Sequence, residues 1–412
     1  MPAVLTQIII HKNFVSDNHL IPVSEALDAV LRTVKAGPVI SVVTEDASGY
    51  VLAQTVKSPY LSPPFDNSAM DGYAFRFDDH VKGKPILIVG EVPAGKKFKR
   101  KLKSGEAVRI FTGAAVPDGA DSVVMQERIF LKEDRLLIRD EKIFRGANIR
   151  KAGSQLKKGA VAIDKGTFLN SGAIGYLSAL GIASVKVFSL PSVAIIVTGD
   201  ELIAPGRKLL PGQIFESNGA TLKSVLQTDI LTNIKIFRTK DTFEATRKVF
   251  QKAFASFDIV LFSGGISEGD YDFVGKVLTA EKVKTVFYKV KQKPGKPLYF
   301  GRKGRKYIFG LPGNPASVLT CYYEYVRPAI RCFQNHSQKN TNTLQLPLTA
   351  TLNKKPGLTH FLKAFTDFKS VTPLPGQESY IMKSFVEANC FIVLNEATEI
   401  INAGEFVDVH LL

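Results

Sequence analysis

The segment that most constrains the fold is 257–272, FDIVLFSGGISEGDYD. An unbroken apolar run over 259–262 ends at two glycines, which is typical of a strand buried on both faces of a parallel sheet. Open parallel sheets bind ligands beyond the carboxyl ends of their strands, where loops and helix N-termini present backbone N–H groups. Because Glu268, Asp270 and Asp272 follow in the turn, this strand end predicts a site for a cation or for a proton to be moved.

Composition indicates an ordinary globular chain of several domains. The 412 residues exceed the roughly 250 to 300 residues at which single cores stop growing. The apolar stretches fall far short of the ~20 residues of a membrane-spanning helix, and 8–10 is too short for a signal-peptide core, so we expect a cytoplasmic protein. Cys321, Cys332 and Cys390 lack CxxC spacing, so neither a disulfide framework nor a zinc site is expected.

The charge balance favours anionic partners. The 54 Lys and Arg against 38 Asp and Glu give a formal net charge of +16, which attracts anions over a long range. Basic residues cluster at 96–101 and 302–306, and we interpret both clusters as solvated hairpin tips between short strands. The sequence has no zinc finger, basic zipper or RNP aromatic signature. A nucleic-acid-binding function would therefore rest on the net charge alone.

Hydrophobic periodicity divides the first half of the chain. It predicts an amphipathic helix over 22–35 with Ser24 as the N-cap, and a helix over 171–180 that Gly181 ends. Between these helices, from about 58 to 153, lie many short β-like segments with Gly and Pro punctuation. This pattern indicates an inserted β domain whose flanks belong together.

From residue 191 the pattern changes to alternating strands and helices. The last helix has a strong start signal, because Asn314 precedes Pro315 at the first helical position. Such alternation predicts a doubly wound α/β domain, and after residue 335 the chain returns to β-like segments. The predicted strands are 193–197, 234–237, 258–262, 285–288 and 307–311, and the predicted helices are 218–227, 242–256, 271–279 and 315–333.

Three further motifs follow strands of this domain: TGDE at 198–201, KVKQKPGKP at 289–297 and YIFGLPGNP at 307–315. Glycine and proline at a strand end are ordinary turn residues, but their joint placement at several strand ends predicts one ligand site. Like charges ~4 Å apart repel by about 4 kcal/mol at an effective dielectric of about 20, so converging acids need cations. Lysines of 289–297 or a bound Mg²⁺ would supply them, which predicts a phosphorylated ligand with a metal.

A fourth motif, FDNSAMDGYA at 65–74, could by itself form only a cap and a tight turn. In the order of the sequence, TGAAVP, TGDEL, SGGISEGDYDF, KPGKP and GLPGNP follow it. With these six ordered motifs, the chain resembles the MoeA family of molybdopterin molybdenumtransferases, which includes the gephyrin E domain. The resemblance runs from about residue 20 to the C-terminus.

The resemblance implies a four-part fold, and the segmentation above agrees with it. The parts are a split helical and mixed domain at 1–57 and 154–190, an inserted β lid at 58–153, an α/β molybdopterin-binding domain at 191–335 that is similar to the molybdopterin adenylyltransferases, and a C-terminal β barrel at 336–412. It also implies an elongated homodimer, with the site between the α/β domain of one subunit and the lid of the other.

The implied reaction inserts the metal of molybdate at the dithiolene of adenylylated molybdopterin and releases AMP with the assistance of Mg²⁺. A molybdopterin adenylyltransferase and molybdoenzyme acceptors are the implied protein partners. Acids would hold Mg²⁺ and orient the attacking oxygen, while lysines offset charge on the phosphates and on molybdate. The implied catalytic residues are Asp66 and Thr112 on the lid side, Glu201, Asp241, Asp272, Lys289 and Lys293. The implied metal ligands are Glu201, Asp241, Asp270 and Asp272, and the residues implied to bind the pterin nucleotide are Ser263, Gly264, Gly265, Ser267, Lys296, Pro312, Gly313, Asn314, Pro315 and Ser379.

Three positions depart from the family pattern. Gln155 stands where the family usually has an acid, and 378–380 reads Glu-Ser-Tyr where Gly-Ser-Gly is usual. Lys363 stands in place of an arginine near Phe361, and lysine cannot form the bidentate fork of arginine to an oxyanion. These departures motivate an alternative hypothesis: a diverged homologue that binds a molybdopterin nucleotide or a metal oxyanion without efficient transfer, or acts as a scaffold.

Overall fold

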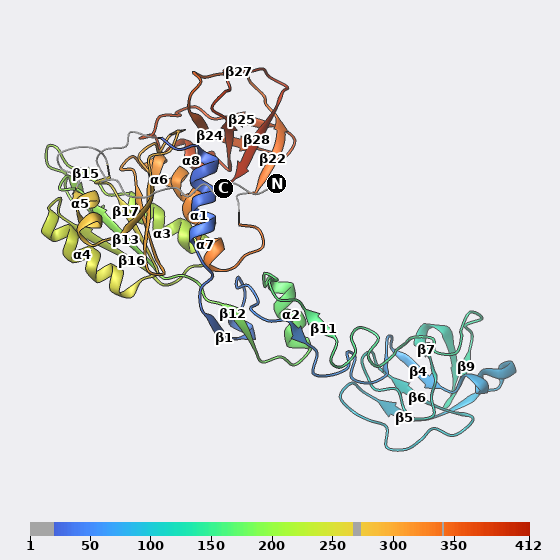
Figure 1. The fold of residues 1–412 in the computed structure, drawn as a ribbon. Helices are drawn as coiled ribbons and strands as arrows, with labels where there is room; N and C mark the ends of the chain where they lie inside the picture. Colours follow the sequence, from blue (N-terminus) through green and yellow to red (C-terminus); the bar gives the residue numbers. More distant parts are fainter. Residues whose placement is uncertain (1–19, 267–272, 340–341) are drawn as a thin grey trace, which may run out of the picture. The chain divides into compact units, whose positions relative to one another are not determined.

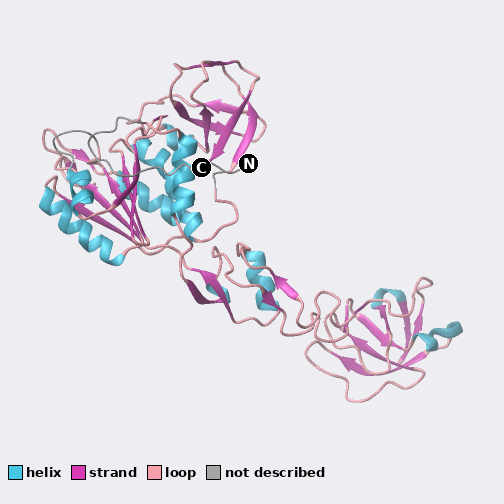
Figure 2. Cartoon of the chain, in the orientation of Figure 1, coloured by secondary structure: helices cyan, strands magenta, loops and turns pink. Residues whose placement is uncertain are grey.

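The computed structural model describes residues 20–266, 273–339 and 342–412, without the side chains of 81–83. The chain forms two compact units, shown in Figure 1 and Figure 2. The first unit comprises the described parts of 1–40 with 49–51 and 187–412, and the second comprises 41–48 and 52–186. The boundary falls within β1 (Val39–Val43) and β12 (Ser184–Phe188), which pair as a two-stranded sheet.

The first unit contains a six-stranded sheet in the order β16-β13-β17-β21-β20-β18. β16, β13, β17 and β21 run parallel to one another, whereas β20 is antiparallel to both β21 and β18. Every residue of β13 and β17 is buried, which confirms the prediction of a strand covered on both faces. The bounds are β16 Ile234–Thr239, β13 Val193–Thr198, β17 Ile259–Ser263, β21 Lys306–Leu311, β20 Tyr299–Lys303 and β18 Lys284–Tyr288.

Helices cover both faces of this sheet, so the predicted doubly wound domain is confirmed. In β17, Ile259 and Leu261 face a core with α1 and α3, whereas Val260 and Phe262 face a core with α4 and α5. This split follows from the period of two in a strand, and Figure 1 shows α4 and α5 on one side of the sheet. The helices are α1 Val23–Thr33, α3 Asn218–Thr228, α4 Phe243–Ser256 and α5 Phe273–Ala280.

Two helix details differ from the sequence-based prediction. Pro22, not Ser24, is the N-cap of α1, because the helix already begins at Val23, a residue that packs against the core. The long helix predicted at 315–333 consists of α6 (Pro315–Cys321), a π-helical turn (Tyr322–Val326) and α7 (Arg327–Phe333). β20 was not predicted; with β21 it forms a hairpin around Gly304, so the predicted turn at 302–306 is confirmed.

The C-terminal part forms a small β barrel. Its sheet has the order β19-β24-β26-β28-β22, with β25 paired to β24. An isolated bridge between Leu348 and Val371 joins the end of β22 to β25, which closes the ring. The strands are β19 Gln292–Lys293, β22 Thr343–Pro347, β24 Thr359–Thr366, β25 Val371–Pro373, β26 Cys390–Leu394 and β28 Phe406–Leu411, beside the ribbon of β23 (Leu352–Asn353) with β27 (Ile400–Ile401) and the helix α8 (Ser384–Glu387).

The second unit contains a six-stranded sheet in the order β7-β4-β6-β5-β9-β8. Because β5 and β6 run parallel, the segment that joins them is a crossover loop. The prediction that 96–101 is a hairpin tip is therefore wrong. The bounds are β4 Gly72–Phe75, β5 Ile86–Val92, β6 Glu106–Ile110, β7 Ser122–Met125, β8 Ile129–Lys132 and β9 Arg135–Ile138.

Shorter elements complete the second unit, with α2 (Ser171–Ala179) as its longest helix. Asn170 caps α2 by accepting a hydrogen bond from the N–H of Ala173, and Gly181 follows with φ +71°, so the prediction of this helix is confirmed. The paired strands are β2 (Val56–Lys57) with β11 (Val161–Ile163) and β3 (Asn67–Ser68) with β10 (Ile149–Arg150). The division of the chain into four domains stays a prediction.

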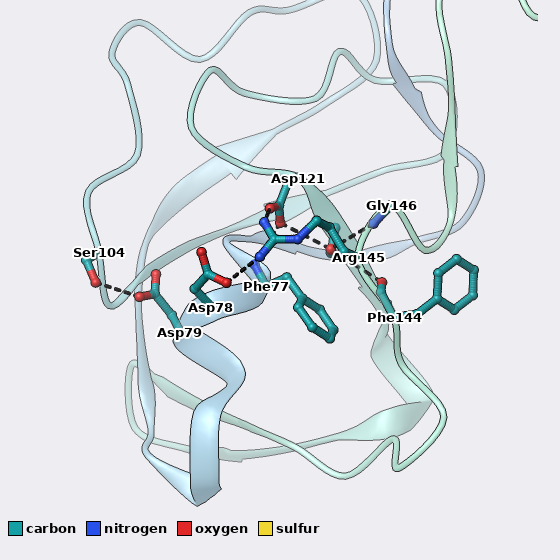
Figure 3. Close-up of polar contacts among 9 residues, drawn as sticks. Phe77, Asp78, Asp79, Ser104, Asp121, Phe144, Arg145 and Gly146 are labelled. Carbon is teal, nitrogen blue, oxygen red and sulfur yellow. Dashed lines mark hydrogen bonds and ion pairs between the residues drawn. The ribbon is translucent and has the colours of Figure 1, made fainter.

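A charged network ties the loops of this sheet together, as Figure 3 shows. The guanidinium of Arg145 lies between Asp78 and Asp121 and forms an ion pair with each carboxylate. Asp121 also accepts a hydrogen bond from the backbone N–H of Phe77 at 2.7 Å. Arg145 therefore fixes the segment after β9 to the segments that precede β7 and follow β4.

Among the residues that the structure describes, no helix is both long and apolar enough to cross a lipid bilayer.

Candidate functional site

A cavity of about 870 Å³ lies at the carboxyl edge of the parallel strands in the first unit. Thr198 at the end of β13, Asp241 after β16 and Ser263 at the end of β17 line it, as does the segment 312–315 after β21. This is the edge at which open α/β sheets bind ligands. The strand end that the sequence singled out therefore opens into this cavity.

The glycine turn after β17 allows a close approach of neighbouring strands. Gly264 and Gly265 have φ values of +90° and +64°, which side chains disfavour. A Cβ on Gly264 would lie 3.0 Å from the carbonyl oxygen of Thr198. The N–H of Gly264 donates to the carbonyl oxygen of Leu311 at 3.2 Å, so the turn joins the ends of β13 and β21.

Two of the predicted acids line this cavity together. They are Glu201, in the segment after β13, and Asp241. The hydroxyl of Thr198 donates to Oδ1 of Asp241, and a parallel pairing of β14 (Leu202–Ile203) with β15 (Ile214–Phe215) fixes the backbone beside Glu201. Within 20–266, 273–339 and 342–412, no three or more His, Cys, Asp or Glu side chains converge as a metal site. The predicted residues Ser267, Asp270 and Asp272 lie outside the described residues.

Two lysines of the KPGKP motif, Lys293 and Lys296, also line the cavity. Both are exposed, and among the described residues neither forms an ion pair. The predicted Lys289 is not among the lining residues: it is buried, and its ammonium lies 5.3 Å from the centroid of the Tyr288 ring. The structure thus brings two of the three predicted lysines to the cavity.

Asn218 is a lining residue that sequence reasoning missed. Its Nδ2 donates to the hydroxyl of Ser263 at 2.9 Å and to the carbonyl oxygen of Gly313 at 2.7 Å. One amide at the start of α3 thereby joins the strand end of β17 to the predicted GLPGNP loop. The only sequence signal was Ser217-Asn218-Gly219, a set that helix starts commonly use.

The C-terminal barrel contributes Ser379 to the cavity. Its hydroxyl accepts a hydrogen bond from Nδ2 of Asn314 at 2.8 Å, and its carbonyl oxygen accepts one from the N–H of Ala316 at 3.0 Å. Asn314 precedes α6 but makes no side-chain cap bond; its Nδ2 bonds Ser379. The predicted residues Pro312, Gly313, Asn314, Pro315 and Ser379 therefore lie together.

Lys363, which stands in place of the family arginine, is buried below this loop. Its ammonium donates to the carbonyl oxygens of Gly376, Glu378 and Ile381. Burial lowers the pKa of Lys363. Because its three donors each have a carbonyl acceptor, Lys363 holds the loop that carries Ser379 and does not offer a free charge to an oxyanion.

The second unit holds Asp66 and Thr112 in separate networks. Asp66 accepts hydrogen bonds from Nζ of Lys151 and from the N–H of Ala152, both at 2.8 Å. The bond from Lys151, reinforced by the backbone bond, lowers the pKa of Asp66. The N–H and hydroxyl of Thr112 both donate to Oδ1 of Asp71, at 2.8 and 2.7 Å.

Gln155, at the position of the missing acid, accepts a hydrogen bond from the hydroxyl of Ser62 at 2.9 Å. Asp66 lines a cavity of about 630 Å³ within the same unit, together with Lys96 and Lys97 of the basic crossover loop. The side-chain amide of Gln155 therefore has a hydrogen-bond partner, and Asp66 lies in a pocket of its own unit.

The fold and the cavity define a class: an α/β ligand-binding protein with an appended β barrel and a second unit that is mainly β. Three family models match the chain in order. "MoeA N-terminal region (domain I and II)" covers 21–181, "Probable molybdopterin binding domain" covers 194–332, and "MoeA C-terminal region (domain IV)" covers 345–412.

Curated relatives and solved structures agree with these matches. The chain is 37% identical over 379 residues to the molybdopterin molybdenumtransferase of Haemophilus influenzae, and the alignment covers 89% of this chain and 93% of that protein. It is 32% identical over 401 residues to the molybdopterin molybdenumtransferase of Staphylococcus aureus, with 95% of each covered. A crystal structure of the molybdopterin biosynthesis MoeA protein of Pyrococcus horikoshii superposes with a TM-score of 0.80 at 28% identity, covering 96% of this chain and all of that one. The chain belongs to the MoeA family.

Proposed function

We propose that this chain is a molybdopterin molybdenumtransferase, which inserts molybdenum from molybdate into adenylylated molybdopterin and releases AMP. The observation that carries the proposal is that Glu201, Asp241, Lys293 and Lys296 line one cavity at the carboxyl edge of the sheet. The names of the relatives at 37% and 32% identity support the same activity. No described feature favours the non-catalytic alternative.

The cavity suits a large anionic substrate. Its volume of about 870 Å³ lies within the roughly 300 to 1,000 Å³ of ligand sites. Lys293 and Lys296 would offset charge on phosphate or molybdate oxygens. Asn218 sets the distance between the glycine turn and the GLPGNP loop, so it would keep two walls of the cavity fixed while the substrate binds.

The two described acids fit a magnesium ion. Carboxylate oxygens are hard ligands, and Mg²⁺ is commonly held by one or two carboxylates with substrate phosphates and water. Glu201 and Asp241 would hold it, with Asp270 and Asp272 as further predicted ligands. When bound, the ion would supply charge stabilisation at the phosphates. The hydrogen bond from the hydroxyl of Thr198 holds the Asp241 carboxylate in its orientation.

On the lid side, Asp66 and Thr112 remain predicted catalytic residues. The lowered pKa of Asp66 means that it would act as a carboxylate and not as an acid. The hydroxyl of Thr112 donates a hydrogen bond to Asp71, so Thr112 would have to break that bond to donate to an oxyanion. Lys289 is not among the residues that line the cavity, and its catalytic role stays a prediction.

We also propose a cytoplasmic homodimer that exchanges substrate and product with a molybdopterin adenylyltransferase and molybdoenzyme acceptors. Support for the dimer comes from β1, on which Val39, Ile40 and Val43 are 52%, 38% and 55% exposed. An exposed apolar strand with an open edge is a template for pairing with another chain, so we expect the second copy to contact β1. Sedimentation of the full chain tests this part separately from activity.

The deciding experiment follows AMP release from adenylylated molybdopterin with Mg²⁺ and molybdate. We expect molybdate-dependent release, lowered at least about a hundredfold by Asp241→Asn, since this change removes charge. The fold should survive, because the Asn carbonyl can still accept from Thr198. We expect the same of Asp272→Asn, whereas Glu244→Gln on the exposed surface of α4 is the matched control. Release equal to that without enzyme would refute the proposed function.

A further inference from the structure

The loop that carries Lys293 and Lys296 is held by one buried amide, that of Gln292. Gln292 is fully buried, and its Nε2 donates to the carbonyl oxygens of Pro294 and Gly295 at 3.1 and 3.2 Å. Its Oε1 accepts a hydrogen bond from the hydroxyl of Tyr325. Both polar ends of the amide are thus used within the protein, and each end contacts a different segment of the chain.

Tyr325 orients this amide through its hydrogen bond to Oε1 of Gln292. It is fully buried and lies in the π-helical turn between α6 and α7. Two carbonyls of the loop accept from one amide that Tyr325 orients, and these hydrogen bonds constrain the backbone between Lys293 and Lys296. The pairing of β19 with β24 anchors the other side, with Lys293 opposite His360. Gly295 packs tightly here, since a Cβ would lie 2.7 Å from Sγ of Cys321.

We propose that Gln292, oriented by Tyr325, is a positioning residue that sets where the ammonium groups of Lys293 and Lys296 meet the phosphate oxygens of the substrate. This inference rests on the proposed function. Lysine is a flexible point charge, so its contribution to binding depends on how well its backbone is fixed. Gln292 borders the cavity, but its side chain is fully buried and both of its amide atoms are bonded within the protein, so its effect passes through the two lysines.

The test compares variants by their affinity for inorganic pyrophosphate, measured by calorimetry on the full chain. We expect Gln292→Met, which fills a similar volume without hydrogen bonds, to weaken binding about tenfold, and Tyr325→Phe to weaken it about threefold. Tyr322→Phe is the matched control: it also removes a buried tyrosine hydroxyl from the same helical turn, but that hydroxyl donates to Asp229 at 2.5 Å. We expect Tyr322→Phe to leave the affinity for pyrophosphate unchanged.

A double-mutant cycle separates positioning from a general loss of stability. If Gln292 acts through the two lysines, then Gln292→Met added to the double variant Lys293→Gln/Lys296→Gln should bind pyrophosphate no more weakly than that double variant does alone. In turnover, Gln292→Met should raise KM for adenylylated molybdopterin and leave kcat nearly unchanged. Losses that add in full, or an equal loss in Tyr322→Phe, would overturn the inference.

The outcome also separates this inference from the proposed function. If neither Lys293→Gln nor Lys296→Gln weakens pyrophosphate binding or AMP release, the cavity is not the phosphate site, and both proposals are wrong. If the lysine variants lose affinity while Gln292→Met retains it at equal thermal stability, only the positioning role is wrong.

Discussion

Nδ1 of His410 lies 2.9 Å from Oε2 of Glu324. This contact joins β28, the last strand of the barrel, to the π-helical turn between α6 and α7. Both side chains are largely buried, and the ring of Phe361 lies 6.2 Å from the imidazole. Burial lowers the pKa of His410, but the hydrogen bond and charge of Glu324, with Asp408 nearby, outweigh it and raise the pKa above its usual value.

This pair predicts a pH-dependent contribution to stability. Because the pKa is higher in the folded chain than in the unfolded one, the stabilisation is complete below the unfolded pKa of about 6.5 and is lost as the pH rises through the folded pKa. The difference in melting temperature between the wild type and His410→Gln should therefore shrink as the pH rises above about 6.5. A difference that stays constant or grows with pH would contradict this assignment.

Replacement of Lys363 should loosen the loop that carries Ser379. Hydrogen bonds from charged groups contribute about 1.5 to 3 kcal/mol, so Lys363→Met, which leaves three carbonyls without this donor, should lower the free energy of unfolding by about 2 kcal/mol. Urea unfolding measures the loss. Lys369→Met, at an exposed lysine nearby, is the control, and an equal effect of both changes would show that the carbonyl contacts of Lys363 contribute nothing.

Two glycines with a similar backbone give a matched test of how tightly the loop that carries Lys293 and Lys296 is packed. Gly295 and Gly304 have φ values of +89° and +63°, so alanine is strained at both. Only at Gly295 would the new Cβ meet a neighbour, Sγ of Cys321 at 2.7 Å, whereas no atom lies within 4 Å at Gly304. Gly295→Ala should destabilise the chain by at least about 1 kcal/mol more than Gly304→Ala. Equal melting temperatures would contradict the tight packing of this loop.

The ion pairs of Arg145 should contribute a small, salt-sensitive stability to the second unit. The side chain of Arg145 is 54% exposed, and exposed pairs are worth about 0 to 1 kcal/mol each. Arg145→Gln should therefore cost about 1 kcal/mol at low ionic strength and less in high salt, where exposed charges are screened. Thermal unfolding in a salt series measures this, and a large loss that salt does not change would mean that Arg145 acts mainly through packing on Phe77, which lies 5.5 Å away.

Much of the fold follows from local pattern. The apolar run at 259–262 and the glycines after it predicted a buried strand and a sharp turn, and β17 and Gly264 have that form. The sequence analysis missed β20, although it pairs with the next strand, β21, in a local hairpin. It placed the basic loop at 96–101 in a hairpin because local pattern does not determine the direction in which β5 and β6 pair, which also depends on their other partners, β9 and β4. The start of α1 was also misplaced, since a serine near a helix start does not always cap it.

The candidate site also has features that the sequence predicted and features that only the folded chain shows. The sequence alone determined the family, the motifs at the strand ends, and the residue types that could bind a phosphorylated ligand with a metal, because glycine turns and clustered charges have local signatures. Only the tertiary structure decided which groups the side chains of Gln292 and Lys363 bond, and that Lys289 is not among the residues that line the cavity. Gln292 and Tyr325 lie 33 residues apart, and the role of a buried amide or ammonium is set by the carbonyls that the folded chain brings within reach.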